Sequence, residues 1–381
     1  MLIKNAKVYN SQNACFERKS INIDNGKIVG FDMDTADGIV IDLNGAYVIP
    51  SLIDVHTHGR AGFDFISASD SELHIMAKAY AKAGVLEVMP SIASASFEDM
   101  LAAVDRVNRF VPDDDEAEFI GVHIEGRYLN PAKKGAHNED FLKPLAAEEL
   151  DRPEFFACRA LHISAALELD GDRFANKAKD IGATIGLGHT NATYQEAKHA
   201  EALGISSYTH LYNCMPQLHH RDGGAVCAAL LGDAYAELIC DGIHISPEMI
   251  RLAHKCKGTE KITLISDSME ATGHSDGDYM IAGNKVIVKN GIARTESGAL
   301  AGSTLSLFDA VTNLMEFCSL SFAEALRCAT INPASQVAVT DRYGSIDIGK
   351  NADLLIVKDI ESPKLEGVII RGKLVSGGID E

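Results

Sequence analysis

The chain has 381 residues, of which 46% are hydrophobic and 23% charged, and its formal net charge is −19. This length is sufficient for a barrel of roughly 250 residues with a smaller additional module. The negative charge argues against nucleic acid and anionic membranes as partners, because both repel an acidic surface.

Two further features predict a cytoplasmic protein. The N-terminal sequence Met1–Asn5 does not open a long apolar stretch of the kind found in signal peptides, and the longest apolar runs are too short for a membrane span. The eight cysteines form no CxxC pair. In a chain of this length, that spacing favours reduced thiols over a disulfide framework.

Both ends of the chain consist of short apolar stretches separated by turn residues. The sequence predicts strands over residues 2–9, 20–23, 27–31 and 40–42, and again over 352–358, 365–370 and 373–376. We therefore predict one small β-sandwich domain assembled from both termini, residues 1–49 and 345–381.

The middle of the chain, residues 50–344, alternates between apolar strands and helical stretches. Strands are predicted over 47–55, 85–92, 118–124, 160–166, 183–188, 205–210, 236–241 and 261–266. Helices are predicted over 71–83, 97–110, 192–203, 247–257, 303–317 and 321–330. This alternation predicts an α/β fold, a (β/α)8 TIM barrel, whose active site lies at the C-terminal ends of the strands. A glycine-rich stretch, 277–298, predicts a hairpin inserted after the eighth strand.

Ionisable residues follow most of the predicted barrel strands. The first strand ends in His56 and His58, and residues two apart on a strand share a face. Later strands end in Glu125, His189, His210, His244 and Asp267. One histidine in such a place is ordinarily a hydrogen-bonded structural residue. Their coincidence at one face of the barrel predicts a catalytic metal site.

Imidazole and carboxylate ligands suit Zn²⁺ or another borderline divalent cation, and the absence of cysteine at these ligand positions argues against a structural zinc site. Such an ion lowers the pKa of a bound water to about 7. Asp267 then fits the base that removes the water proton and delivers it to a leaving amine. The residues predict metal-assisted hydrolysis of an amide or a similar bond. The same residues could also bind Fe²⁺, Co²⁺ or Mn²⁺, and they are compatible with either one or two ions.

Longer motifs surround these residues. They include His123-Ile124-Glu125-Gly126, Gly188-His189-Thr190-Asn191, Thr209-His210-Leu211-Tyr212-Asn213 and Ser266-Asp267-Ser268-Met269. With them the chain resembles, over essentially its whole length, the amidohydrolase superfamily and within it the N-acetylglucosamine-6-phosphate deacetylases. The resemblance implies that Glu125, His189 and His210 bind the main metal. Because His56 and His58 are retained, it also implies a possible second metal, bridged by Glu125.

The resemblance implies further roles at positions that match the motifs. Asp267 is the catalytic acid and base, and His137 contacts the acetamido carbonyl and stabilises the oxyanion. The phosphate-binding positions are the Asn213-Cys214 backbone, Arg221 and His244. Members of the family are typically homodimers, so the Arg221 loop can reach the site of the neighbouring subunit. An arginine fork suits phosphate and would provide a local cationic pocket in an acidic protein.

The favoured substrate is N-acetyl-D-glucosamine 6-phosphate. The alternatives are N-acetyl-D-galactosamine 6-phosphate, which differs at the C4 hydroxyl, a cyclic amide, and no substrate at all, as in an inactive metal-binding relative. Cyclic-amide hydrolases use a bridging lysine on the fourth strand, and no lysine occurs between Lys143 and Lys177. Arg60 and Arg127 depart from the family pattern. They are either solvated surface cations or residues that alter substrate choice.

Overall fold

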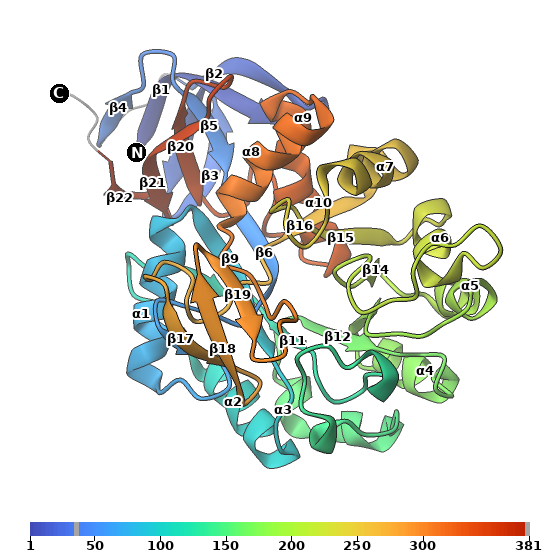
Figure 1. Ribbon diagram of the computed structural model, residues 1–381. Helices are drawn as coiled ribbons and strands as arrows, with labels where there is room; N and C mark the ends of the chain where they lie inside the picture. The colour runs from blue at the N-terminus through green and yellow to red at the C-terminus, as the bar shows by residue number, and fades with distance from the viewer. Residues whose placement is uncertain (34–37, 378–381) are drawn as a thin grey trace.

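The computed structural model describes residues 1–33 and 38–377. Strands from both ends of the chain lie in one eight-stranded sheet, drawn in blue and red in Figure 1. They are β1 (Leu2–Asn10), β2 (Cys15–Asp24), β3 (Lys27–Phe31), β4 (Val40–Asp42), β5 (Tyr47–Pro50), β20 (Leu354–Lys358), β21 (Lys364–Ile370) and β22 (Lys373–Ser376). The predicted β domain built from both termini is confirmed. Its limits at 49/50 and 344/345 stay a prediction, and residues 34–37 and 378–381 lie outside the described ranges.

Alternate side chains of this terminal sheet face two different cores. Val8, Val48 and Leu354 pack in a cluster of their own, whereas Tyr9, Ile49 and Leu355, each the next residue along the chain, join the main hydrophobic core. Successive residues of a strand point to opposite faces, so a continuous apolar run can serve both cores. One face of the sheet thus packs against the rest of the molecule.

The middle of the chain forms a parallel barrel, as predicted. Its strands are β6 (Leu52–Thr57), β9 (Val85–Ile92), β11 (Val122–Ile124), β12 (Leu161–Ala165), β13 (Thr184–Leu187), β14 (Ser207–Tyr208), β15 (Tyr235–Ile239) and β16 (Ile262–Ile265), with β10 (Glu118–Phe119) also beside β9. Backbone hydrogen bonds join the ends of the first and last strands. Asp267 N–H donates to His56 O at 2.9 Å, and His58 N–H donates to Ser268 O at 2.8 Å.

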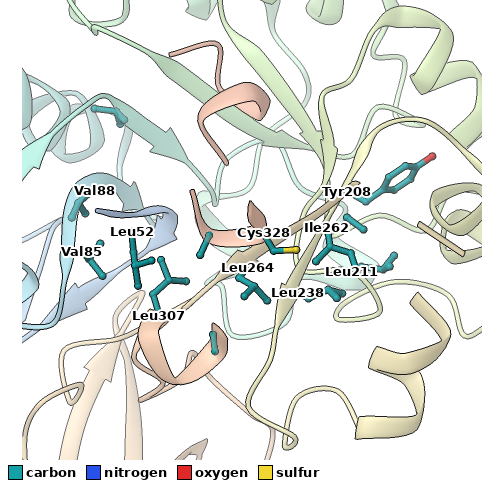
Figure 2. Close-up of a cluster of buried hydrophobic side chains, with 14 of the residues drawn as sticks. Leu52, Val85, Val88, Tyr208, Leu211, Leu238, Ile262, Leu264, Leu307 and Cys328 are labelled. Carbon is teal, nitrogen blue, oxygen red and sulfur yellow. The ribbon is translucent and has the colours of Figure 1, made fainter. Parts of the chain in front are cut away.

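Helices surround the barrel (Figure 1). They are α1 (Asp70–Lys82), α2 (Phe97–Arg109), α3 (Pro153–Phe156), α4 (Asp172–Asp180), α5 (Tyr194–Leu203), α6 (Gly224–Leu231), α7 (Pro247–Lys257), α8 (Leu307–Cys318), α9 (Phe322–Leu326) and α10 (Ile331–Gln336). Figure 2 shows part of the core between strands and helices, where Leu52, Leu264 and Leu307 are drawn together. Within the described ranges, none of the helices has the length and apolar character needed to cross a membrane.

Two details differ from the sequence prediction. The apolar run 47–55 is two strands, because β5 pairs with β1 and β20 of the terminal sheet while β6 begins the barrel. The insertion at 277–298 is a three-stranded sheet, β17 (Gly277–Ile281), β18 (Asn284–Lys289) and β19 (Ile292–Thr295), rather than a two-stranded hairpin. A small hairpin, β7 (Gly59–Arg60) and β8 (Phe63–Asp64), follows the first barrel strand.

Candidate metal centre

Glu125 lies between two pairs of histidines. Its Oε2 is 2.9 Å from His58 Nε2 and 3.1 Å from His56 Nε2. Its Oε1 is 2.9 Å from His210 Nε2 and 3.3 Å from His189 Nε2. The two carboxylate oxygens therefore serve two separate groups of potential ligands, His56–His58–Glu125 and Glu125–His189–His210. A carboxylate so placed can bridge two cations.

Three of the predicted site residues at the strand ends have an unusual backbone conformation. His189, His210 and Asp267 have φ angles of 46°, 31° and 48°, in the left-handed region that residues with a Cβ adopt rarely. Each such conformation costs about 1–2 kcal/mol. Residues held in sparsely populated backbone regions cluster at functional sites, where the surrounding fold over-determines them. The fold therefore holds these three residues in unfavourable backbone conformations, in which their side chains converge on one centre.

Hydrogen bonds on the far side of two rings direct their Nε2 lone pairs toward the centre. His189 Nδ1 is 2.7 Å from Lys133 O, which can only accept, so the proton of the neutral ring lies on Nδ1. His56 Nδ1 likewise lies 3.5 Å from Glu237 Oε2, a carboxylate oxygen that can accept the Nδ1 proton. Partners of this kind fix the tautomer of metal-binding histidines. In addition, His189 Nε2 lies 3.0 Å from His210 Nε2, where two lone pairs repel unless a cation or a proton lies between them. The residues fit a divalent cation.

Asp267 and His137 flank the same centre. Asp267 Oδ1 is 3.4 Å from His58 Nε2 and 3.5 Å from His56 Nε2. Burial raises the pKa of Asp267, but the facing histidines outweigh it and hold that pKa below its usual value. Burial also lowers the pKa of His137 to about 4. At neutral pH, Asp267 is therefore an ionised base and His137 a neutral imidazole with one N–H to donate.

The centre opens into a cavity at the C-terminal ends of the strands. Its polar lining residues are His58, Glu125, His137, His189, His210, Asn213, His244 and Asp267, with Cys214 beside them. His244 is held by Asp241, whose Oδ2 lies 2.6 Å from His244 Nδ1. Arg221 is exposed and lies outside the lining of this cavity in the described part of the chain. Of the predicted phosphate-binding positions, the structure brings three to the cavity and leaves Arg221 on the surface.

Arg127 is not a free cation at the cavity mouth. Both its Nε and Nη2 donate to the Glu149 carboxylate, with an Nε–Oε2 distance of 2.7 Å, and its guanidinium stacks on the Phe97 ring at 4.4 Å. Its side chain is 12% exposed. Arg60 is likewise largely buried, and its guanidinium lies 5.4 Å from the centre of the Tyr80 ring. Neither arginine lines the cavity in the described residues. The expectation of solvated surface cations is wrong, and a direct role in substrate choice gains no support.

Replacing Arg127 with leucine is therefore expected to lower the free energy of unfolding by about 1–3 kcal/mol, because Glu149 loses its charged partner. Relative kcat/KM values for different N-acetylated sugar phosphates should stay the same. Urea unfolding together with these kinetics checks both parts. A changed substrate preference at unchanged stability would contradict this account.

Two further buried residues support the metal ligands, and of these Glu237 was not predicted from the sequence, whereas His123 was a candidate because it lies two residues before Glu125. Glu237, on β15, is 1% exposed and accepts from Ser207 Oγ at 2.8 Å and Gln336 Nε2 at 2.7 Å, besides facing His56. His123 is buried between Ser91 and Ser164 hydroxyls, and its ring centre lies 4.5 Å from that of His56. The position of this glutamate inside the apolar run Tyr235–Ile239 could have indicated its role. Buried charges need partners, so such a residue marks an interior polar network.

Comparison with known proteins agrees with the fold. The sequence pattern of the amidohydrolase family matches residues 47–375. This chain belongs to the amidohydrolase family. The match confirms the resemblance drawn from the strand-end motifs, and it covers the barrel together with strands of the terminal sheet.

Among amidohydrolases, the chain is similar to N-acetylglucosamine-6-phosphate deacetylase of Vibrio furnissii, with 36% identity over 88% of this chain and 84% of the relative. It is also similar to N-acetylgalactosamine-6-phosphate deacetylase of Escherichia coli O157:H7, with 34% identity over 88% of this chain and 90% of the relative. Among solved structures, N-acetylglucosamine-6-phosphate deacetylase of Thermotoga maritima superposes with a TM-score of 0.87 at 29% identity, covering 99% of this chain and all of that one.

Proposed function

We propose that this amidohydrolase removes the acetyl group from N-acetyl-D-glucosamine 6-phosphate, giving D-glucosamine 6-phosphate and acetate. The observation that carries the proposal is the arrangement of Asp267 and His137 around a ligand set centred on Glu125. Similarity to the Vibrio furnissii and Thermotoga maritima deacetylases supports the substrate.

We propose that the cofactor is a divalent cation, most simply Zn²⁺, with one or two ions per subunit. The main ion would be held by Glu125, His189 and His210, and the second by His56, His58 and the other oxygen of Glu125. Fe²⁺, Co²⁺ and Mn²⁺ accept the same ligands, and the supply of metal decides among them. When bound, such a cation polarises the carbonyl group and makes water a nucleophile near neutral pH.

The protein side chains then supply the proton transfers. Asp267 takes a proton from the attacking water and delivers it to the amide nitrogen as the C–N bond breaks. His137 Nδ1 lies 3.3 Å from Ser94 Oγ, which can donate to it when the ring proton is on Nε2. From Nε2 it can be donated to the acyl oxygen as negative charge develops there. The products are acetate and a primary amine.

The phosphate group would be bound by the Asn213-Cys214 backbone, His244 and Arg221. The first three positions line the cavity. Because Arg221 is exposed in one chain, we propose a homodimer in which the Arg221 loop completes the site of the neighbouring subunit. Sedimentation velocity showing only monomer at assay concentrations would contradict this.

The three alternative functions are supported to different degrees. N-acetyl-D-galactosamine 6-phosphate remains a second candidate, since a relative at 34% identity is named for that substrate. Cyclic-amide hydrolysis is disfavoured because β12, Leu161–Ala165, carries no lysine, and Glu125 belongs to both groups of potential metal ligands. A purely metal-binding role is disfavoured because Asp267 and His137 both face the ligand set.

The test is acetate release from both hexosamine phosphates by metal-replete protein, with and without a chelator. We expect a higher kcat/KM for the glucosamine derivative and loss of activity on chelation, restored by adding a divalent cation. Release from neither substrate would reject the deacetylase assignment, and a preference for the galactosamine derivative would transfer it to the second candidate.

We also propose that the protein acts in the cytoplasm, since its eight cysteines are all free thiols. Recovery of the protein from a culture medium or periplasmic fraction of the source cells would contradict this.

A further inference from the structure

The sheet inserted after the eighth barrel strand forms an apolar wall of the cavity. Ile281 and Ala282 at the end of β17, together with Leu300 and Ala301 after β19, line the same cavity as the candidate metal ligands. Figure 1 draws the inserted strands in orange. The polar lining residues, histidines, two carboxylates and the Asn213 amide, all lie elsewhere, where Ala93, Ala136 and Ile239 are further apolar lining residues. An apolar wall in such a cavity is suited to contact with an apolar part of the substrate.

This wall is attached to both residues that would act on the acyl group. Ile281 and Ala301 pack in one cluster with Met269 and Ala271, which closely follow Asp267 in the chain, and Ala136, which precedes His137, packs against that cluster. Two hydrogen bonds fix the attachment. Ser303 N–H donates to Asp267 O at 2.7 Å, and Asn284 Nδ2 donates to Ala136 O at 2.7 Å. The apolar wall therefore extends from Asp267 to the loop that carries His137.

Ile281 lies at the centre of this arrangement. Its side chain is nearly buried, at 5% exposure. Its Cδ1 is 3.1 Å from the position that a Cβ on Gly302 would occupy, and that position is 3.3 Å from Asp267 O. Gly302 itself lines the cavity. The terminal methyl of Ile281 thus lies beside the strand exit that presents Asp267.

The chemistry of the substrate suggests what this wall contacts. On the proposed function, on which this inference rests, the acyl carbon lies between Asp267 and His137. The sugar offers hydroxyl groups and a phosphate, so the methyl of the acetyl group is the apolar group nearest to the reacting bond. We propose that Ile281 packs against this methyl group and limits the length of the acyl chain that the enzyme removes.

The proposal is tested with N-acetyl, N-propionyl and N-butyryl derivatives of glucosamine 6-phosphate, measuring kcat/KM for release of the free amine. One methylene in an apolar pocket changes kcat/KM by about 10–200-fold. We expect the unmodified enzyme to discriminate against the longer chains by a factor in this range for each added methylene. Ile281→Ala should reduce that discrimination at least about 10-fold, and it should lower kcat/KM for the acetyl substrate by a smaller factor, because the contact with the acetyl methyl is lost. Ile281→Val, which removes only Cδ1, should shift the ratio in the same direction with less risk to folding.

Ile287→Val and Ile287→Ala are the matched controls. Ile287 lies on β18 of the same inserted sheet, but it is 44% exposed and does not line the cavity. Both control variants should keep the acyl preference of the unmodified enzyme. A change in them equal to that of the Ile281 variants would mean that loosening of the sheet, not contact with the acyl chain, is responsible.

Three other results would overturn the inference. They are equal turnover of all three acyl derivatives by the unmodified enzyme, unchanged ratios in both Ile281 variants, and a uniform loss for all three substrates. In each case acetyl hydrolysis by the unmodified enzyme still supports the proposed function. If the unmodified enzyme releases amine from none of them, the proposed function fails and this inference fails with it.

Discussion

The variant Asp267→Asn is expected to lower kcat for acetate release by about 10²–10⁴-fold, the usual contribution of a general acid–base residue. Asparagine occupies nearly the same volume but cannot accept a proton at neutral pH. The cation content should stay that of the unmodified protein. Asp267 belongs to neither group of potential ligands, since its carboxylate lies 3.4–3.5 Å from the Nε2 atoms of His58 and His56, and Glu125 still joins both groups.

Asp105→Asn is a suitable control for that experiment. Asp105 lies on α2, is 53% exposed and forms an ion pair with Arg109, four residues along the same helix. It should leave kcat unchanged. Asp267→Asn protein that keeps its cation content and more than about a tenth of its kcat would show that another group carries the proton.

The second large effect is expected for Glu125→Gln. A glutamine oxygen is a neutral, weaker ligand, and its amide NH₂ would face one of the two histidine pairs with a donor instead of an acceptor. We expect the bound cation per chain to fall and acetate release to decrease more than about 100-fold, beyond the 10–100-fold typical of residues that only support ligands. The rise in melting temperature on adding divalent cation should also disappear, because that rise requires binding to the folded state.

Glu87→Gln provides the matched control, since Glu87 is also a buried glutamate on a barrel strand. Burial, together with the nearby carboxylate of Asp353, raises its pKa and so disfavours the charged form, which makes a neutral glutamine a mild replacement here. This variant should bind the cation and hydrolyse substrate like the unmodified protein. If Glu125→Gln retained full metal content and activity, the bridging arrangement proposed for Glu125 would be wrong.

Periodicity explains why much of the fold and centre was predictable. His56 and His58 share a strand face, and Glu125, His189, His210 and Asp267 each follow an apolar run, so parallel strands bring all six to one end of a barrel. The sequence could not show where a continuous apolar run changes sheets. The run 47–55 is apolar on both sides of Ser51, and only tertiary pairing assigns Tyr47–Pro50 to the terminal sheet.

Contacts between distant residues account for what was not predicted. Arg127 was expected to be either a solvated cation or a residue that alters substrate choice, but its partner Glu149 lies 22 residues away on a separate short helical segment. Glu237 is separated by 181 residues from His56, whose ring it faces. No local pattern specifies such pairs. A charged residue inside an apolar strand indicates that a buried partner exists without indicating which one.

We propose that Glu125, His189 and His210 bind a shared cation, and X-ray absorption at the metal edge identifies the ligands of that cation. Chelated protein would be reloaded with Zn²⁺ and compared with the Glu125→Gln and His210→Asn variants. We predict imidazole nitrogen and carboxylate oxygen ligands at about 2.0–2.2 Å, with the spectrum altered in both variants. A shell of sulfur ligands at about 2.3 Å, or a spectrum unchanged in both variants, would contradict the claim.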